Sequence, residues 1–307
     1  MKVSIPSGAE GPGTEGLPAL RGGRLRRLRT ALLEWYLPRA RPLRIRGTRE
    51  PWAILVSEVM AQQTQITRVD GAWAVFMARY PTPRALAQAS TAEVLRAWAG
   101  LGYNRRALNL RRAAATIEEV YAGRVPSDVT GLEALPGVGS YTARAVAAIA
   151  FGLPVAAVDT NVRRVITRVI GAELTPRALQ TEADEWVDKG DPATWTHATM
   201  ELGATVCVSR RPRCEVCPLT DWCASQGRVE AAPTRASAEN VPFERTTRWL
   251  RGRIIERLRA LDEGAWDQLP RSMGEHDEAA LTAAVIALEQ DGLLERRFDG
   301  AVRLPSG

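Results

Sequence analysis

All four cysteines of the 307-residue chain lie within seventeen residues, at Cys207, Cys214, Cys217 and Cys223. A disulfide scaffold spreads many cysteines along a short chain, so this grouping indicates one metal site instead. The spacing C-x6-C-x2-C-x5-C contains one C-x2-C pair, whereas a structural zinc site usually has two such pairs across a longer gap. Short loops between four thiolates suit a [4Fe–4S] cluster. Zinc and four free thiols are the alternatives.

The charge of the chain favours a polyanionic partner. Lys and Arg total 41 against 35 for Asp and Glu, a formal net charge of +6, and all but two of the basic residues are arginines. The arginine guanidinium is well suited to bidentate contacts with phosphate. No apolar run of about 18 residues predicts a membrane span, and the N-terminus lacks a secretory signal.

The periodicity between Arg24 and Gly227 is helical nearly throughout, which predicts an all-α fold. A helix is expected to begin at Pro51 and to carry Trp52, Leu55, Val59 and Ile66 on one face. Further helices are predicted at 70–79, 84–88, 91–99, 104–121, 140–151, 160–170, 177–188 and 195–206. Residues 1–23 are predicted to form a disordered leader. The predicted organisation after it is a domain at 24–227, a linker at 228–245 and a small module at 246–307.

The C-terminal module differs in character from the rest of the chain. Two apolar stripes at helical spacing precede segments 292–297 and 301–304, which flank Asp299-Gly300. This dipeptide between two short strands predicts a hairpin with a two-residue turn. Helices followed by a hairpin indicate a small winged-helix-like module.

A glycine-rich turn precedes the helix predicted at 140–151. Residues 135–143 read Leu-Pro-Gly-Val-Gly-Ser-Tyr-Thr-Ala, with glycines at Gly137 and Gly139. The glycines permit a sharp turn, after which successive N–H groups at the helix N-terminus point outward. The segment therefore predicts a phosphate-binding hairpin.

This hairpin, the segment Val-Asp-Thr-Asn-Val-Arg-Arg at 158–164 and the cysteine spacing together resemble the endonuclease III-like helix–hairpin–helix DNA glycosylase superfamily. Residues 57–65 and the Gly-Leu-Gly-Tyr turn at 100–103 are similar to its MutY-type adenine glycosylase branch. The resemblance covers roughly residues 28–226 and implies a six-helix barrel with a [4Fe–4S] subdomain. It further implies excision of adenine from A:G or A:8-oxoguanine pairs in double-stranded DNA. We expect a monomer in the cytoplasm, associated with a bacterial nucleoid.

Glu58 is the candidate general acid. On the helix predicted from Pro51, it shares a polar strip with Gln62 and Gln65 and lies at the margin of the apolar face. A carboxyl group partly withdrawn from water holds its proton more tightly, which suits proton donation near neutral pH. By its sequence position alone Glu58 fits an ordinary surface glutamate better, and the resemblance assigns it the protonation of adenine.

Asp159 precedes the predicted helix 160–170 and is expected to be its N-cap. A capping carboxylate stays ionised beside the positive helix end, and such an anion can stabilise an oxocarbenium-like sugar cation. The resemblance implies that role and places Asn161 in the active site. It also places Tyr141 where strand-cutting members have a Schiff-base lysine, and a phenol cannot form a Schiff base. The chain is therefore expected to hydrolyse the glycosidic bond without cutting the strand.

The remaining site residues are candidates for DNA contacts. Tyr103 resembles a wedge that enters the base stack, and Gln62 and Gln63 resemble residues inserted near the target pair, although a polar helix face also explains them. Arginines in the first cysteine loop are expected to bind phosphate: Arg210, Arg211 and Arg213. Four arginines are expected to follow the DNA backbone, although a solvated helix face also explains them: Arg105, Arg106, Arg111 and Arg112. Arg163 and Arg164, beside Asn161, fit solvated helix arginines equally well.

The tail departs from the resemblance. About sixty residues follow the linker, too few for the Nudix-like domain with which such adenine glycosylases read 8-oxoguanine. A preference for 8-oxoguanine is therefore left open, whereas adenine excision is not. The competing functions are a thymine or uracil mismatch glycosylase on the same scaffold, an endonuclease III-like lyase, and a non-catalytic lesion-binding protein.

Overall fold

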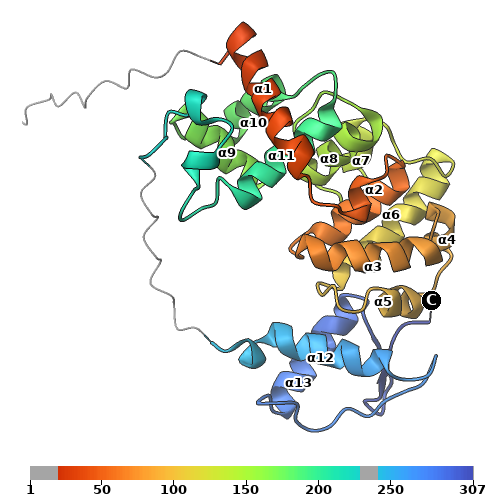
Figure 1. The fold of residues 1–307 in the computed structure, drawn as a ribbon. Helices are drawn as coiled ribbons and strands as arrows, with labels where there is room; N and C mark the ends of the chain where they lie inside the picture. Colours follow the sequence, from red (N-terminus) through yellow and green to blue (C-terminus); the bar gives the residue numbers. More distant parts are fainter. Residues whose placement is uncertain (1–19, 229–240, 307) are drawn as a thin grey trace, which may run out of the picture. The chain divides into compact units, whose positions relative to one another are not determined.

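The computed structural model describes residues 20–228 and 241–306 (Figure 1). Within these ranges the chain forms thirteen α-helices and one hairpin of two short strands, which confirms the predicted all-α class. No helix in the described ranges is long and apolar enough to cross a membrane. Residues 1–19 of the predicted leader, 1–23, and most of the predicted linker, 228–245, lie outside the described residues. The last two leader residues, Gly22 and Gly23, belong to the first helix.

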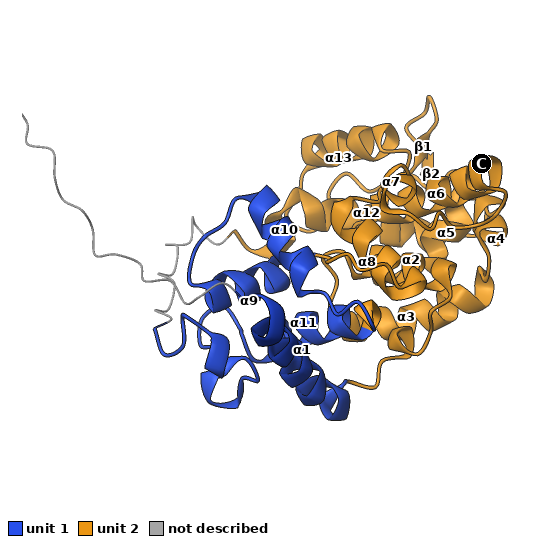
Figure 2. Ribbon diagram, turned by 90° about the horizontal axis from the view of Figure 1, so that it is seen from above, with its two compact units in different colours: residues 1–40, 158–190, 194–232 blue, residues 41–157, 191–193, 233–307 orange. Residues whose placement is uncertain are grey.

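The chain divides into two compact units (Figure 2). The first contains the described parts of residues 1–40, 158–190 and 194–232, and the second those of 41–157, 191–193 and 233–307. The predicted domain 24–227 thus contributes to both units, and the chain passes from the second to the first one residue before Asp159.

The first unit is built around α9 (Thr160–Ile170), whose apolar residues all lie on one face. This unit also contains α1 (Gly22–Tyr36), α10 (Pro176–Trp186) and most of α11 (Pro192–Thr205). Gly171 ends α9 with a φ of +79°, a left-handed conformation that favours glycine. The core of the unit is formed by fully buried side chains from three of these helices: Leu28, Leu32, Val165, Ile166, Ala183 and Trp186.

The second unit is built around α2 (Pro51–Ala61), a helix that is apolar on nearly every side. It packs against α3 (Ile66–Arg79), α6 (Arg105–Tyr121) and α8 (Ser140–Phe151). Two shorter helices, α4 (Pro83–Ala87) and α5 (Thr91–Ala97), pack on α6. Because a helix that is apolar all round belongs in a core, the polar residues of α2 are the ones that need a functional or local explanation.

The helix predicted from Pro51 is shorter than expected. It ends at Ala61, and a new helix begins at Ile66, so Glu58, Gln62 and Gln65 do not share one helical strip. The cause is Arg106, whose Nη1 donates to the carbonyl oxygens of Val59 and Met60. These oxygens would otherwise accept the next two helical N–H groups. The chain instead turns at Gln63, whose φ is +56°.

The glycine-rich turn lies between two helices, of which the sequence predicted only the second. The first, α7 (Val129–Glu133), is too short to show periodicity, but Asp128 caps it by accepting from the N–H of Gly131. It packs on α8, whose bounds agree with the predicted 140–151. Together α7, the turn and α8 form a helix–hairpin–helix.

The C-terminal residues form the predicted two helices and hairpin. Helices α12 (Thr247–Arg259) and α13 (Glu278–Gln290) pack against each other (Figure 1), and strands β1 (Glu295–Arg296) and β2 (Val302–Arg303) pair antiparallel. The turn is not the predicted two-residue one. The Arg297 N–H donates to the Ala301 carbonyl, which leaves a three-residue loop, and Gly300 takes the left-handed position in it with a φ of +85°.

Candidate functional site

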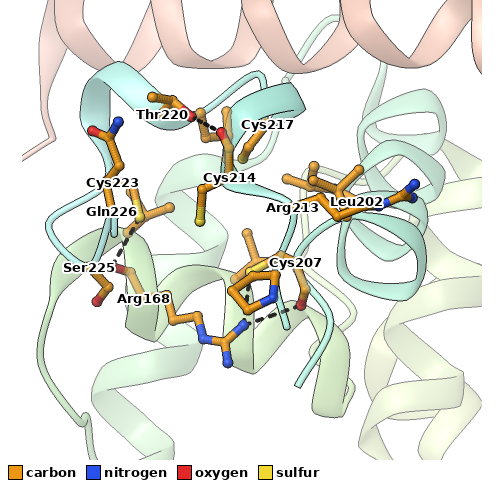
Figure 3. A pocket seen from close by; sticks show the side chains of 15 residues that line it. Arg168, Leu202, Cys207, Arg213, Cys214, Cys217, Thr220, Cys223, Ser225 and Gln226 are labelled. Carbon is orange, nitrogen blue, oxygen red and sulfur yellow. Dashed lines mark hydrogen bonds between the residues drawn. The ribbon is translucent and has the colours of Figure 1, made fainter. Parts of the chain in front are cut away.

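The four cysteines line one pocket in the first unit (Figure 3). All four are partly buried, and none forms a disulfide. Apolar side chains complete the walls, among them Val165, Leu202 and Leu219. Within the described ranges, no three or more His, Cys, Asp or Glu side chains are close enough to hold a single metal ion.

The chemistry of this pocket fits an iron–sulfur cluster. Burial raises the pKa of the Cys217 thiol to about 11, and burial also raises the pKa of Cys223. Only a positively charged group bound between the thiols would keep them as thiolates at neutral pH. Four thiolates in an apolar pocket are the donor set of a [4Fe–4S] cluster, which would tie the loop together when bound.

Arg168 anchors the first cysteine loop, a role the sequence analysis missed. From α9 its guanidinium donates to the carbonyls of Val208 and Ser209, at 2.7 and 2.8 Å, and lies 3.4 Å from the Cys207 sulfur. The backbone after the last cysteine returns to the same helix, where the Ser225 N–H donates to the Arg168 carbonyl at 3.1 Å. The Cys223 sulfur lies 3.4 Å from the same carbonyl oxygen (Figure 3). The cysteine segment is thus fixed to the C-terminal half of α9 from both ends.

The three arginines of that loop have different surroundings. The Arg213 guanidinium donates to the Thr205 carbonyl, and its N–H donates to the Val206 carbonyl, so it holds the loop in place. Arg210 and Arg211 are exposed, and among the described residues neither has an ion-pair partner. These two arginines therefore fit the predicted phosphate contacts better than Arg213 does.

Asp159 caps α9, as the sequence predicts. Its Oδ1 accepts from the N–H groups of Asn161 and Val162, at 2.9 and 2.7 Å, and its Oδ2 accepts from the Asn161 side-chain amide at 2.9 Å. Every one of these partners is a donor, and the carboxylate also lies at the positive end of the α9 dipole.

Arg164 connects this cap to the cysteine loop and is not a solvated helix arginine. It donates to Asn161 Oδ1 at 2.8 Å, to the Gly203 carbonyl at 2.6 Å and to the Cys207 carbonyl at 2.7 Å. Because Arg164 occupies the amide oxygen, the Asn161 NH₂ group faces Asp159. Arg163, by contrast, is exposed and pairs with Glu173 at 3.3 Å.

Glu58 and the hairpin lie in the second unit. Glu58 is half-buried on α2, between fully buried turns that carry Leu55 and Val59. Gln62, the C-cap residue that follows α2, donates to the Thr142 hydroxyl at 3.2 Å and lies 3.4 Å from the Gly137 carbonyl. Gln62 is therefore in contact with the hairpin and not free on a helix surface.

The hairpin requires its glycines. Gly137 has a φ of +79°, and a Cβ there would lie 2.6 Å from the Asn109 Cβ. Gly139 precedes α8 and supplies no side chain to the first-turn N–H groups, which a phosphate oxygen can then approach. Tyr141 is the second residue of α8 and is half-buried.

Tyr103 is presented by a strained turn. It has a φ of +45° and is 38% exposed, an unusual combination for an aromatic residue, and it follows glycines at positions 100 and 102 that also have positive φ. Arg106 fixes the turn by donating to the carbonyls of Leu101 and Gly102, at 3.0 and 3.1 Å. Arg106 is buried, so it does not follow the DNA backbone as one reading of the sequence suggested.

Comparison with known proteins decides the family. The profile of the HhH-GPD superfamily of base excision DNA repair proteins matches residues 56–189, and that of the iron–sulfur binding domain of endonuclease III matches 207–223. An adenine DNA glycosylase of Mycobacterium tuberculosis H37Rv is 42% identical over 294 residues, which cover 90% of this chain and 93% of the relative. The chain belongs to the adenine DNA glycosylase family.

Members of neighbouring branches are similar over a smaller part of the chain. A thymine-DNA glycosylase of Aeropyrum pernix is 35% identical over 66% of this chain and 95% of its own. The solved structure of a thermostable thymine-DNA glycosylase aligns with a TM-score of 0.63 at 29% identity, over 66% of this chain and 96% of its own. A trapped endonuclease III–DNA covalent intermediate aligns with a TM-score of 0.57 at 27% identity, over 66% and 97%.

These findings confirm the predicted helix–hairpin–helix fold and the [4Fe–4S] cofactor. As a member of the adenine DNA glycosylase family, this protein is a base excision repair hydrolase that cleaves N-glycosidic bonds in DNA.

Proposed function

We propose that this protein hydrolyses the N-glycosidic bond of adenine paired with guanine or 8-oxoguanine in double-stranded DNA and leaves an abasic site. The observation that carries the proposal is the similarity to an adenine DNA glycosylase over nine-tenths of the chain. The monomeric state and the association with a bacterial nucleoid stay predictions from the sequence.

The chemistry assigns different tasks to the two carboxyl groups. A base inside a duplex is out of reach, so the adenine must first leave the stack, with Tyr103 and Gln63 near the vacated position. Glu58 then protonates the adenine, which makes it a better leaving group. The Asp159 carboxylate stabilises the cationic sugar as the bond breaks, and water adds to the sugar carbon and loses a proton. The fixed orientation of Asn161 supports this role because it holds the carboxylate in place.

Tyr141 supports hydrolysis without strand cleavage. A lyase needs an amine that forms a Schiff base with the sugar, and the phenol at this position of α8 has none. The product of the proposed reaction is therefore an abasic site in an intact strand.

The test is single-turnover base release from matched duplexes containing A:8-oxoguanine, A:G or T:G, followed by alkaline cleavage of the product. We expect adenine release from the first two and none from T:G. The E58Q and D159N variants should bind the duplex and lose at least about a thousandfold in rate, within the range of removing a general acid or a preorganised charge. The matched controls are E119Q, an exposed glutamate on α6, and D277N, the N-cap of α13.

Two outcomes would contradict the proposal. Thymine release with silent adenine substrates would favour a mismatch thymine glycosylase, the activity named for the Aeropyrum pernix relative. Binding without release from any of the three duplexes would favour a lesion-binding protein. Activity that survives either carboxyl substitution would overturn the assignment of roles.

A further inference from the structure

The C-terminal module is fixed to the part of the second unit that carries Tyr103. Arg259 of α12 donates to the side chain of Asn104 at 2.7 Å, and Arg96 of α5 donates to the Leu261 carbonyl at 3.2 Å. The N–H of Ala92 donates to the carbonyl of Pro305 at 2.9 Å. Arg259 is half-buried in this contact, and desolvation lowers its pKa to about 10, which still leaves it protonated at neutral pH. The module is therefore held beside the Tyr103 turn by specific contacts from the C-terminal end of α12 and from the residues after β2.

Arg248 lies directly on Tyr103. The guanidinium carbon is 4.0 Å from the centre of the tyrosine ring, and both side chains are exposed. The exposed ring of Phe243, in the segment that leads into α12, is 5.9 Å from the same guanidinium. An arginine from the module thus covers one face of the aromatic residue assigned to enter the base stack.

The exposed and half-buried arginines around Arg248, from Arg245 to Arg257, are paired with carboxylates, and Arg248 is not. The pairs are Arg245 with Glu275, Arg251 with Asp291, Arg253 with Glu256 and Arg257 with Asp267. Across the ranges that the structure describes, no carboxylate pairs with Arg248. Its charge is available to an anion from outside the chain.

The second helix of the module is unsuited to the same task. Helix α13 carries no lysine or arginine, and its N-terminal residues are acidic. In the usual winged-helix arrangement the helix before the hairpin enters the DNA groove, but here that helix would repel the phosphate backbone. The basic N-terminal end of α12 is therefore the part of the module that fits DNA.

We propose that the C-terminal module is part of the DNA-binding surface and that Arg248 binds a backbone phosphate beside the base step that Tyr103 enters. The proposal rests on the proposed function for the role of Tyr103. A ring between two bases has its faces against those bases, so the guanidinium must leave the ring when the duplex binds. Each strand carries one phosphate for every 3.4 Å or so of helix axis, so one lies within a side-chain length of the inserted ring. A charge-assisted bond to that phosphate replaces a weaker exposed cation–π contact.

The test compares R248Q with R253Q, which removes an equal charge from the same helix at a residue already paired with Glu256 at 2.5 Å. The probe is a duplex with a tetrahydrofuran abasic-site analogue opposite guanine, which requires no base release. Dissociation constants are measured over a series of salt concentrations for both full-length variants and the wild type. We expect R248Q to reduce the slope of log K against log salt by about 0.9, the effect of one lost phosphate contact, and R253Q to leave it unchanged.

Equal slopes for R248Q and wild type, or equal losses for the two variants, would overturn the proposal. Tighter binding by R248Q would also overturn it, because Arg248 would then obstruct Tyr103 instead of contacting DNA. Circular dichroism and thermal unfolding check that both variants fold. Since the probe is not a substrate, failure of adenine release with a reduced slope for R248Q would contradict the proposed function alone.

Discussion

Replacing Arg106 with methionine tests whether one buried side chain fixes both the end of α2 and the Tyr103 turn. Its guanidinium donates to the carbonyls of Val59, Met60, Leu101 and Gly102 and to the Thr64 hydroxyl, at 2.7–3.1 Å. Methionine has a similar length and apolar volume but no donor. The substitution therefore removes the hydrogen bonds while it leaves little cavity.

The expected magnitude follows from the acceptors that are left without a donor. Val59 and Met60 are buried, and an unpaired buried carbonyl costs about 1–3 kcal/mol, so these two alone cost roughly 4 kcal/mol. The carbonyl of the exposed Gly102 can bind water and adds little. We expect the free energy of unfolding to fall by about 4 kcal/mol and the melting temperature by about 10 °C, measured by circular dichroism.

The pH dependence of this effect has a defined sign. Burial lowers the pKa of Arg106 to about 10, well below its ordinary value, so the unfolded chain binds the proton more tightly than the folded one. Stability should therefore rise with pH only above about 10, where the folded form loses its proton first. Below that value both states are protonated, and the difference between R106M and wild type should stay constant from about pH 6 to pH 9.

The matched control is R105M, on the same turn of α6. Its side chain is 71% exposed and pairs with Asp291 at 3.5 Å, so its loss should cost less than about 1 kcal/mol. Equal losses for R106M and R105M would refute the argument. The stability difference between R106M and wild type could instead disappear within the range from about pH 6 to about pH 9. That result would refute the protonation state assigned to Arg106.

Two further predictions concern the hairpin and the cysteine pocket. G137A should weaken duplex binding at least about tenfold, measured by fluorescence anisotropy, because the new Cβ would lie 2.6 Å from Asn109 in a backbone conformation unsuited to alanine. The control is G252A, where nothing lies within 4 Å of the new Cβ. Equal affinities of the two variants would contradict the hairpin assignment. C217A should lose the visible absorbance of the cluster. It should also bind DNA more weakly, because Arg210 and Arg211 lie in the loop that the cluster holds together. Retained DNA affinity without the cluster would show that this loop folds unaided.

The helices and the main site residues could be predicted from the sequence because their signals are local. The bounds of α8 and α9 follow from periodicity together with the glycine and the aspartate that precede them. The cysteines identify themselves by spacing. The cap at Asp159 needs no information from outside its own helix. Helix α7 was missed because five residues are too few for a periodic pattern, although Asp128 is a local cap signal that could have indicated it.

The roles of the arginines could not be predicted in this way. Arg106 bonds to carbonyls 46 and 47 residues earlier in the chain, and Arg164 bonds to one 43 residues later. A main-chain carbonyl is present at every position, so no residue type marks such a partner in the sequence. The end of α2 at Ala61 was missed for the same reason, since the donor that ends it comes from α6.

The near-absence of lysine from this chain therefore has two physical explanations, and a pair of substitutions separates them. An arginine that binds phosphate supplies charge, and lysine can replace much of that function. An arginine such as Arg164 uses its planar fork to bind Asn161 and two carbonyls at once, which a single ammonium group on a shorter side chain cannot do. R248Q is expected to reduce the slope of log K against log salt, and we expect R248K to restore at least half of that reduction. R164K should lower single-turnover base release about tenfold or more, with duplex affinity unchanged and R163K as its exposed control. Wild-type rates for R164K would mean that Arg164 acts through charge alone and that the orientation of Asn161 does not depend on it.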